Sequence, residues 1–158
     1  SSKIETTPQG ALLSPGNLAD WRDAQAEQFV KHRLKLHVPD ADFETSNSAQ
    51  LYKSVIDKFI DAGAKICLVS FPTAPVYRDY LYMQEPVTLE RWSAAKSFFA
   101  NLAENPNISF VDHSGYYDDP TLFRDPDHLN KQGAIQYGPV LHDACFEGAS
   151  TRDVIASR

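Results

Sequence analysis

The chain has 158 residues, with 15 Lys and Arg against 21 Asp and Glu, so its formal net charge is −6. This acidic balance excludes a nucleic-acid-binding protein, because phosphate neutralisation needs a basic surface stripe that the sequence does not contain. With 42% hydrophobic and 23% charged residues the composition predicts a single globular domain, and the longest apolar runs, such as residues 66–69, are too short to span a bilayer.

The organisation of the chain follows from where periodic patterns begin and end. Residues 1–13 are polar and show no period, so we expect an irregular N-terminal segment there. Residues 14–147 carry the patterned elements of one α/β domain. Residues 148–158 show no pattern and are expected to fray.

Two helices are predicted in the first part of the domain. Ser14 followed by Pro15 is typical of a helix start, and this helix is expected to run to about Leu34. The second helix begins at Ser48 and ends at Gly63, which is suited to the position after a helix. Its apolar residues recur at the spacing of an amphipathic helix: Leu51, Tyr52, Val55, Ile56, Phe59 and Ile60.

A buried strand and a further helix come next. Residues 65–70 form a short continuous apolar run, which predicts a strand buried on both faces. Pro72 and Pro75 end this strand. Thr88 is a suitable cap for the helix that follows. The apolar face of that helix comprises Leu89, Trp92, Ala95, Phe99 and Leu102.

A second strand, residues 108–112, follows a turn at 105–107. Strand, crossover helix and strand in this order predict a right-handed βαβ unit with parallel strands. Reactive groups in such sheets gather at the carboxyl ends of the strands, here after Ser70 and after Asp112.

The segment with the strongest chemical signal lies between the second strand and the last helix. Asp125 and His128 are three residues apart on an expected tight turn, a spacing that can place the carboxylate against Nδ1 of the imidazole. This contact would leave Nε2 free to act as a general base. Asn130 is expected to cap a helix that continues to Leu141, with a break or kink at residues 138–139.

The block Asp125-Pro126-Asp127-His128-Leu129-Asn130, with Gly133 three residues on, resembles the last conserved block of the SGNH (GDSL-like) hydrolases. The similarity covers roughly residues 51–141. It implies a flavodoxin-like fold, in which helices flank a parallel sheet, with Asp125 and His128 as catalytic residues. The sequence looks most like the bacterial cell-envelope members, which transfer or remove acyl groups on polysaccharides.

The sequence departs from this family at the nucleophile. The family places its serine in a Gly-Asp-Ser block near the N-terminus, and no such tripeptide occurs here. Its oxyanion-hole residues also have no clear counterpart, since Gly16-Asn17 is followed by Leu18. About five parallel strands would be needed and two are recognisable. We therefore expect the chain to be the C-terminal portion of an incomplete domain, which associates with a missing N-terminal portion.

The resemblance implies a serine-type ester hydrolase or O-acyltransferase that needs neither a cofactor nor a metal. Its substrate would be an acyl ester, acetyl in the first instance, of a carbohydrate such as a polysaccharide. The same resemblance suggests the cell envelope, the periplasm or secretion. Two alternatives stay open: an inactive SGNH-like module that binds carbohydrate or protein, and a flavodoxin-like regulatory domain in which the Asp-His spacing is accidental.

Other polar residues have simpler interpretations. Asp127 is interpreted as a solvated or capping acid, Ser70 as structural, and the Asp112-His113 pair as no dyad, since neighbours on a strand face opposite ways. The remaining histidines, His32, His37 and His142, have no companions that suggest a role. The acids Asp118, Asp119, Asp125 and Asp127 do not match a calcium loop.

Two further groups leave alternatives open. Five tyrosines fall in the two loops expected beside the site, where they could stack on a sugar or simply cover the core: Tyr77, Tyr80, Tyr82, Tyr116 and Tyr117. For Cys67 and Cys145, two buried free thiols are the favoured interpretation and a single disulfide is the alternative.

Overall fold

The computed structural model describes residues 5–6, 12–13, 16–38, 43–84 and 86–147. Its helices are α1 (Asp23–His37), α2 (Asn47–Asp61), α3 (Pro75–Gln84), α4 (Pro86–Leu102) and α5 (Lys131–His142). Its strands are β1 (Glu5–Thr6), β2 (Leu12–Leu13), β3 (Ile66–Ser70), β4 (Ile108–Asp112), β5 (Phe123–Asp125) and β6 (His128–Leu129). Short helical turns are η1 (Leu18–Asp20), η2 (Pro120–Leu122) and the π-helical η3 (Asp143–Glu147).

The central element is the parallel pair β3 and β4, whose register runs from Ile66 opposite Ile108 to Ser70 opposite Asp112. Both predicted strands and their parallel pairing are confirmed, and the structure is therefore of the α/β class. Within the described part of the chain this sheet has two strands. The flavodoxin-like arrangement with further strands stays a prediction.

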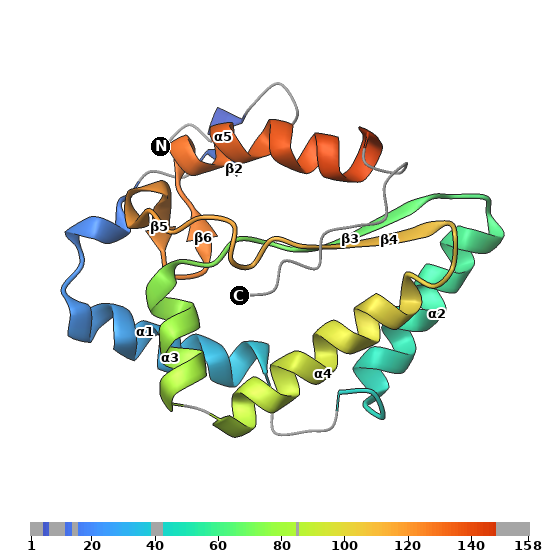
Figure 1. Ribbon diagram of the computed structural model, residues 1–158, viewed down its shortest axis with the longest axis horizontal. Helices are drawn as coiled ribbons and strands as arrows, with labels where there is room; N and C mark the ends of the chain where they lie inside the picture. Colours follow the sequence, from blue (N-terminus) through green and yellow to red (C-terminus); the bar gives the residue numbers. More distant parts are fainter. Residues whose placement is uncertain (1–4, 7–11, 14–15, 39–42, 85, 148–158) are drawn as a thin grey trace.

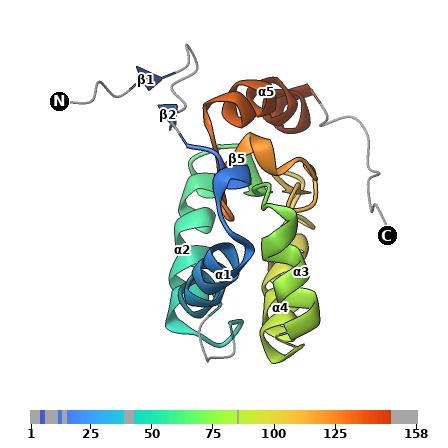
Figure 2. The same cartoon turned by 90° about the vertical axis from the view of Figure 1, so that its left-hand side faces the viewer.

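Helices cover the sheet on two sides. In Figure 1, α5 lies on one side of β3 and β4, and the helices α1 to α4 lie on the other; Figure 2 shows the same division from the end. Ile56 of α2 packs against Leu68 and Ile108 of the two strands, with Phe99 of α4 beside them. A second cluster joins α1 to α3 through Val30, Leu34, Tyr77 and Leu81.

The first predicted helix begins later than expected. Ser14 and Pro15 lie outside the described residues. Gly16 has a φ of +119° and cannot continue a right-handed helix, and a Cβ there would lie 2.8 Å from Cγ of Arg124. After the turn η1, α1 starts at Asp23, and its C-terminal end is His37 rather than Leu34.

The segment expected as a loop after β3 contains a helix. Pro75 opens α3, because a proline in the first turn loses no helical hydrogen bond. Three of the five tyrosines predicted to lie in loops lie on a helix instead, and that prediction is wrong for them. Tyr77, Tyr80 and Tyr82 are all on α3. The Tyr77 side chain is fully buried against α1. The following helix, α4, begins at Pro86, before the predicted cap at Thr88.

The predicted helix at residues 48–63 is confirmed in its position but not in its burial. Ser46 caps α2 by accepting a hydrogen bond from the backbone of Ala49, and Gly63 follows the helix with a φ of +83°. The apolar face is largely exposed, at 66% for Leu51 and 57% for Phe59. The strand β3 is likewise only partly covered, so the prediction of a strand buried on both faces is wrong.

Two predictions concern the last helix and the two cysteines. The predicted break at residues 138–139 is wrong, because α5 continues through Pro139, which is exposed; the alternative of a kink there stays a prediction. Cys67 and Cys145 form a disulfide that ties β3 to η3, so the interpretation as free thiols is wrong and the alternative is confirmed.

No helix in the described ranges combines the length and apolarity needed to cross a membrane.

The two terminal segments are only partly described. The tail expected at residues 148–158 lies outside the described residues. Within the expected irregular segment 1–13, β1 and β2 pair in an antiparallel register of two residues each. Strands of two residues are too short to show an alternating pattern, so the sequence predicts no strand there.

Candidate active site

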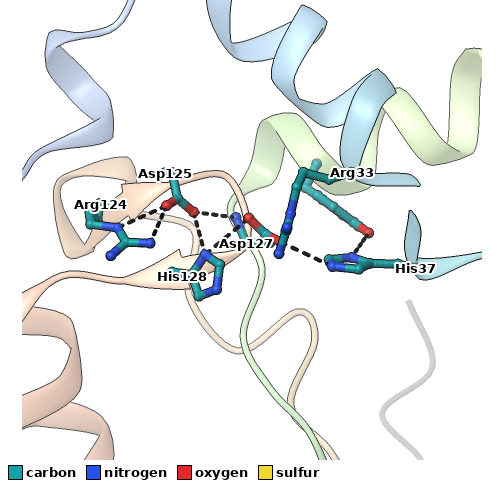
Figure 3. A network of polar contacts seen from close by, with 7 residues as sticks. Arg33, His37, Arg124, Asp125, Asp127 and His128 are labelled. Carbon is teal, nitrogen blue, oxygen red and sulfur yellow. Dashed lines mark hydrogen bonds and ion pairs between the residues drawn. The ribbon is translucent and has the colours of Figure 1, made fainter. Parts of the chain in front are cut away.

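The hairpin formed by β5 and β6 carries the predicted acid and base. Asp125 ends β5, His128 begins β6, and the two residues are opposite each other in the register, with Pro126 and Asp127 as the connection. Nδ1 of His128 lies 2.8 Å from Oδ1 of Asp125. Figure 3 shows the two side chains pointing toward one another. The contact expected from the sequence is thus present.

The other face of the imidazole is open. The His128 side chain is 48% exposed, and none of the described residues forms a hydrogen bond with its Nε2. With Nδ1–H donated to the carboxylate, the neutral ring presents the Nε2 lone pair outward. This is the orientation that a general base requires.

Asn130 fixes the hairpin to the last helix. Its Oδ1 accepts a hydrogen bond from the backbone of Gly133 at 3.0 Å, which confirms its predicted role as the cap of α5. Its Nδ2 donates to the carbonyl of Thr121 at 2.6 Å, on the segment just before β5. Gly133 allows this close packing, because a Cβ there would lie 2.1 Å from the carbonyl oxygen of Leu122.

The Asp125 carboxylate is buried and held from both sides. Arg124 donates through Nε and Nη2 to Oδ2, at 2.9 and 2.8 Å, while Oδ1 also accepts the backbone N–H of Asp127. Burial raises the pKa of Asp125, but its interactions with His128, Asp127 and Arg124 outweigh this effect and hold the pKa below its usual value. Asp125 therefore stays ionised and remains an acceptor for the imidazole at neutral pH.

Asp127 is neither solvated nor a helix cap, so its predicted role is wrong. Its side chain is only 5% exposed, and Arg33 donates from Nε to Oδ2 at 2.7 Å. The other oxygen, Oδ1, lies 3.2 Å from Nδ1 of His128. In the hairpin turn the alternation of a strand does not apply, and both acids flank the same ring nitrogen.

His37 also has partners, contrary to the prediction. Its Nδ1 lies 2.9 Å from the Tyr77 hydroxyl, and its Nε2 lies 3.5 Å from Oδ2 of Asp127. Burial lowers the pKa of His37 in spite of the nearby Asp127. Burial likewise raises the pKa of Tyr77. The sequence contained a signal for this pair, because Arg33 and His37 are four residues apart and therefore share one face of α1.

The polar residues at the carboxyl ends of β3 and β4 form a separate set. Asp112 pairs with Lys96 at 2.8 Å, whereas Nδ1 of His113 lies 2.9 Å from the Tyr137 hydroxyl. Asp112 and His113 thus have different partners, as expected. Ser70 lines a cavity of about 160 Å³ with Lys96, and among the described residues no hydrogen bond joins it to His128.

Aromatic side chains gather beside this set. Tyr116 is half-exposed and packs on His113 and Tyr137, and the exposed Phe71 contacts Tyr137 from the loop after β3. Tyr117 packs edge-on against Tyr116. Phe71 and Tyr116 leave part of their ring surface exposed to solvent.

A metal ion is the other possible occupant of the hairpin. Ligand atoms of Asp125, Asp127 and His128 lie within 4.8 Å of one another. Both carboxylates are already paired with guanidinium groups, those of Arg124 and Arg33, and these cations oppose a second positive charge. The arrangement therefore suits a proton better than a divalent cation.

Two of the acids that do not match a calcium loop, Asp118 and Asp119, have other partners. Asp118 pairs with Arg78, and Asp119 caps η2 by accepting from the backbone of Thr121.

No family model matches the sequence, and no curated protein is significantly similar to it.

Proposed function

We propose that the chain supplies the base and the orienting acid of an SGNH-type serine esterase or O-acyltransferase that acts on acyl esters of carbohydrates. One observation carries the proposal: the 2.8 Å contact between Oδ1 of Asp125 and Nδ1 of His128, with the Nε2 side of the ring open. An imidazole oriented by a buried carboxylate is the base that serine-hydrolase chemistry uses.

In this mechanism, Nε2 of His128 takes the proton from a serine hydroxyl while the serine oxygen forms a bond to the ester carbonyl carbon. His128 then returns the proton to the leaving alcohol as the ester bond breaks. Asp125 stabilises the imidazolium that exists between these two steps. Water or a sugar hydroxyl takes up the acyl group in the second half of the reaction. The serine itself is not identifiable in this sequence.

Two further features support the substrate and location that the proposal includes. Disulfides persist mainly in oxidising compartments, and the Cys67–Cys145 bond fits a protein of the cell envelope or one that is secreted. The exposed rings of Phe71 and Tyr116 are suited to contact with a sugar face. Acetyl groups on polysaccharide hydroxyls are therefore the first substrates to test.

A fluorophosphonate probe, which reacts with activated serines, tests the proposal on the natural protein at its full length. We expect one serine to be labelled, to be identified by mass spectrometry, and to lose its label in His128→Ala. His142→Ala is the matched control, because His142 is an exposed histidine beside a single acid, Asp143. Absence of labelling, together with absence of acetyl-ester cleavage, would refute the proposal and favour an inactive binding module.

A further inference from the structure

Nδ1 of His128 faces two carboxylates rather than one. Oδ1 of Asp125 lies 2.8 Å away and Oδ1 of Asp127 lies 3.2 Å away, on the two sides visible in Figure 3. Nδ1 carries a single hydrogen, so only one acid can accept it with good geometry at a time. The closer acid, Asp125, accepts it in this structure.

The second acid is buried with one oxygen unused. Arg33 satisfies Oδ2 of Asp127, but no described residue forms a hydrogen bond with Oδ1. A buried carboxylate oxygen without a donor is unfavourable, and such atoms are uncommon in folded proteins. The His128 ring nitrogen Nδ1, 3.2 Å away, is a donor in position to relieve it.

Asp127 is also prevented from turning away. Arg33 holds it from α1, and His37, which contacts the Tyr77 hydroxyl, lies behind the same oxygen. Each acid of the hairpin thus has its own arginine, Arg33 for Asp127 and Arg124 for Asp125. Both carboxylates remain directed at one ring nitrogen.

We propose that Asp127 is a second positioning residue for His128, able to accept Nδ1–H when Asp125 does not. Either acid then keeps the proton on Nδ1 and the lone pair on Nε2. The catalytic meaning of this inference rests on the proposed function, in which His128 is the base. The structural part does not, and it can be measured on the chain without any substrate.

The test is the tautomer of neutral His128, read from ring ¹⁵N chemical shifts at alkaline pH. We expect Asp125→Ala and Asp127→Ala each to keep the Nδ1–H form. The double variant Asp125→Ala/Asp127→Ala should lose it and show a mixture of both tautomers. The inference is overturned if Asp125→Ala alone already shows the mixture seen in the double variant.

A second measurement covers the case in which Asp125→Ala does not fold. In Asp127→Ala alone, the Nδ1 proton resonance of His128 should shift, because one of its two neighbouring carboxylates is gone; an unchanged resonance contradicts the inference. Asp143→Ala, which removes an exposed acid beside His142, is the control that should leave His128 unaffected. Backbone amide spectra report whether each variant is folded.

The two proposals fail in different ways. If the single variants keep the Nδ1–H form but the natural protein cleaves no ester and binds no serine probe, the proposed function is wrong and the positioning role of Asp127 stands. If ester cleavage depends on His128 but Asp125→Ala alone shows the mixture of tautomers, the proposed function stands and the positioning role of Asp127 is wrong.

Discussion

Arg33 and Asp127 lie 94 positions apart in the sequence, yet Nε of Arg33 donates to Oδ2 of Asp127 at 2.7 Å. This contact ties α1 to the turn of the hairpin that carries Asp125 and His128. Because Asp127 is buried, the guanidinium is what makes a charged carboxylate tolerable there. The helix therefore helps to set the geometry of the candidate site.

Replacing Arg33 tests how much this tie contributes. We expect Arg33→Met to lower the free energy of unfolding by about 2 kcal/mol, because it removes the guanidinium from the buried Asp127 carboxylate. The loss is moderated because the Arg33 side chain is itself partly exposed. Urea titration measures the change. Lys53→Met is the matched control: it breaks an exposed ion pair with Asp57 and should change the free energy of unfolding by less than about 0.5 kcal/mol. Equal effects of the two substitutions would contradict a structural role for Arg33.

Replacing Gly133 by alanine is expected to destabilise the protein more than replacing Gly115. A Cβ at residue 133 would meet the Leu122 carbonyl at 2.1 Å, so Gly133→Ala must displace either α5 or the segment before β5. The expected loss of stability is roughly 1–3 kcal/mol, the usual effect of forced overpacking. Gly115→Ala has no atom within 4 Å of the new Cβ and should change stability by less than about 0.5 kcal/mol. Thermal unfolding of both variants gives the comparison, and similar melting temperatures would count against the close packing.

His37 gives the protein a defined response to mild acid. Burial lowers its folded-state pKa below 6.5, so the folded protein binds fewer protons at this site than the unfolded chain does. The stability that depends on neutral His37 is complete above about pH 6.5 and is lost as the pH falls toward the lowered value. His37→Gln should flatten the stability profile in this window, whereas His32→Gln, an exposed position on the same helix, should not. Urea midpoints between about pH 7.5 and 5 provide the test; a profile unchanged by His37→Gln would refute this account.

The disulfide should be a major contributor to stability. Cys67 and Cys145 close a loop with a sequence separation of 78 residues, and a loop of that length predicts about 4.5 kcal/mol in the chain-entropy description. Cys67→Ser/Cys145→Ser should be destabilised by about this amount, and a reducing agent should bring the unmodified protein toward the same value. If reduction leaves the unfolding midpoint unchanged, the bond does not constrain the chain.

Local signals predicted local structure well. The strands β3 and β4 and the helix α2 followed from short apolar patterns, and the left-handed Gly63 marked the end of the helix. The cap at Ser46 was not predicted. The contact between Asp125 and His128 was also predictable, because the two residues are three positions apart and lie opposite each other on one tight hairpin.

Contacts between distant segments were not predictable. The burial of Asp127 depends on Arg33 and His37, which a different helix brings to the hairpin. Pro75 could equally well end a strand or open a helix, and only the packing of Tyr77 and Leu81 against α1 decides between the two. The exposed face of α2 shows the same limit, since periodicity indicates an apolar face but not what covers it.

We propose His128, oriented by Asp125, as the base of an acyl-transfer reaction. The most direct test is the initial rate of acetyl-ester hydrolysis by the natural protein and by its His128→Ala variant, with His142→Ala as the control. We predict a fall of roughly 10³-fold or more for His128→Ala and an unchanged rate for His142→Ala. Hydrolysis that continues at the same rate without His128 would contradict it.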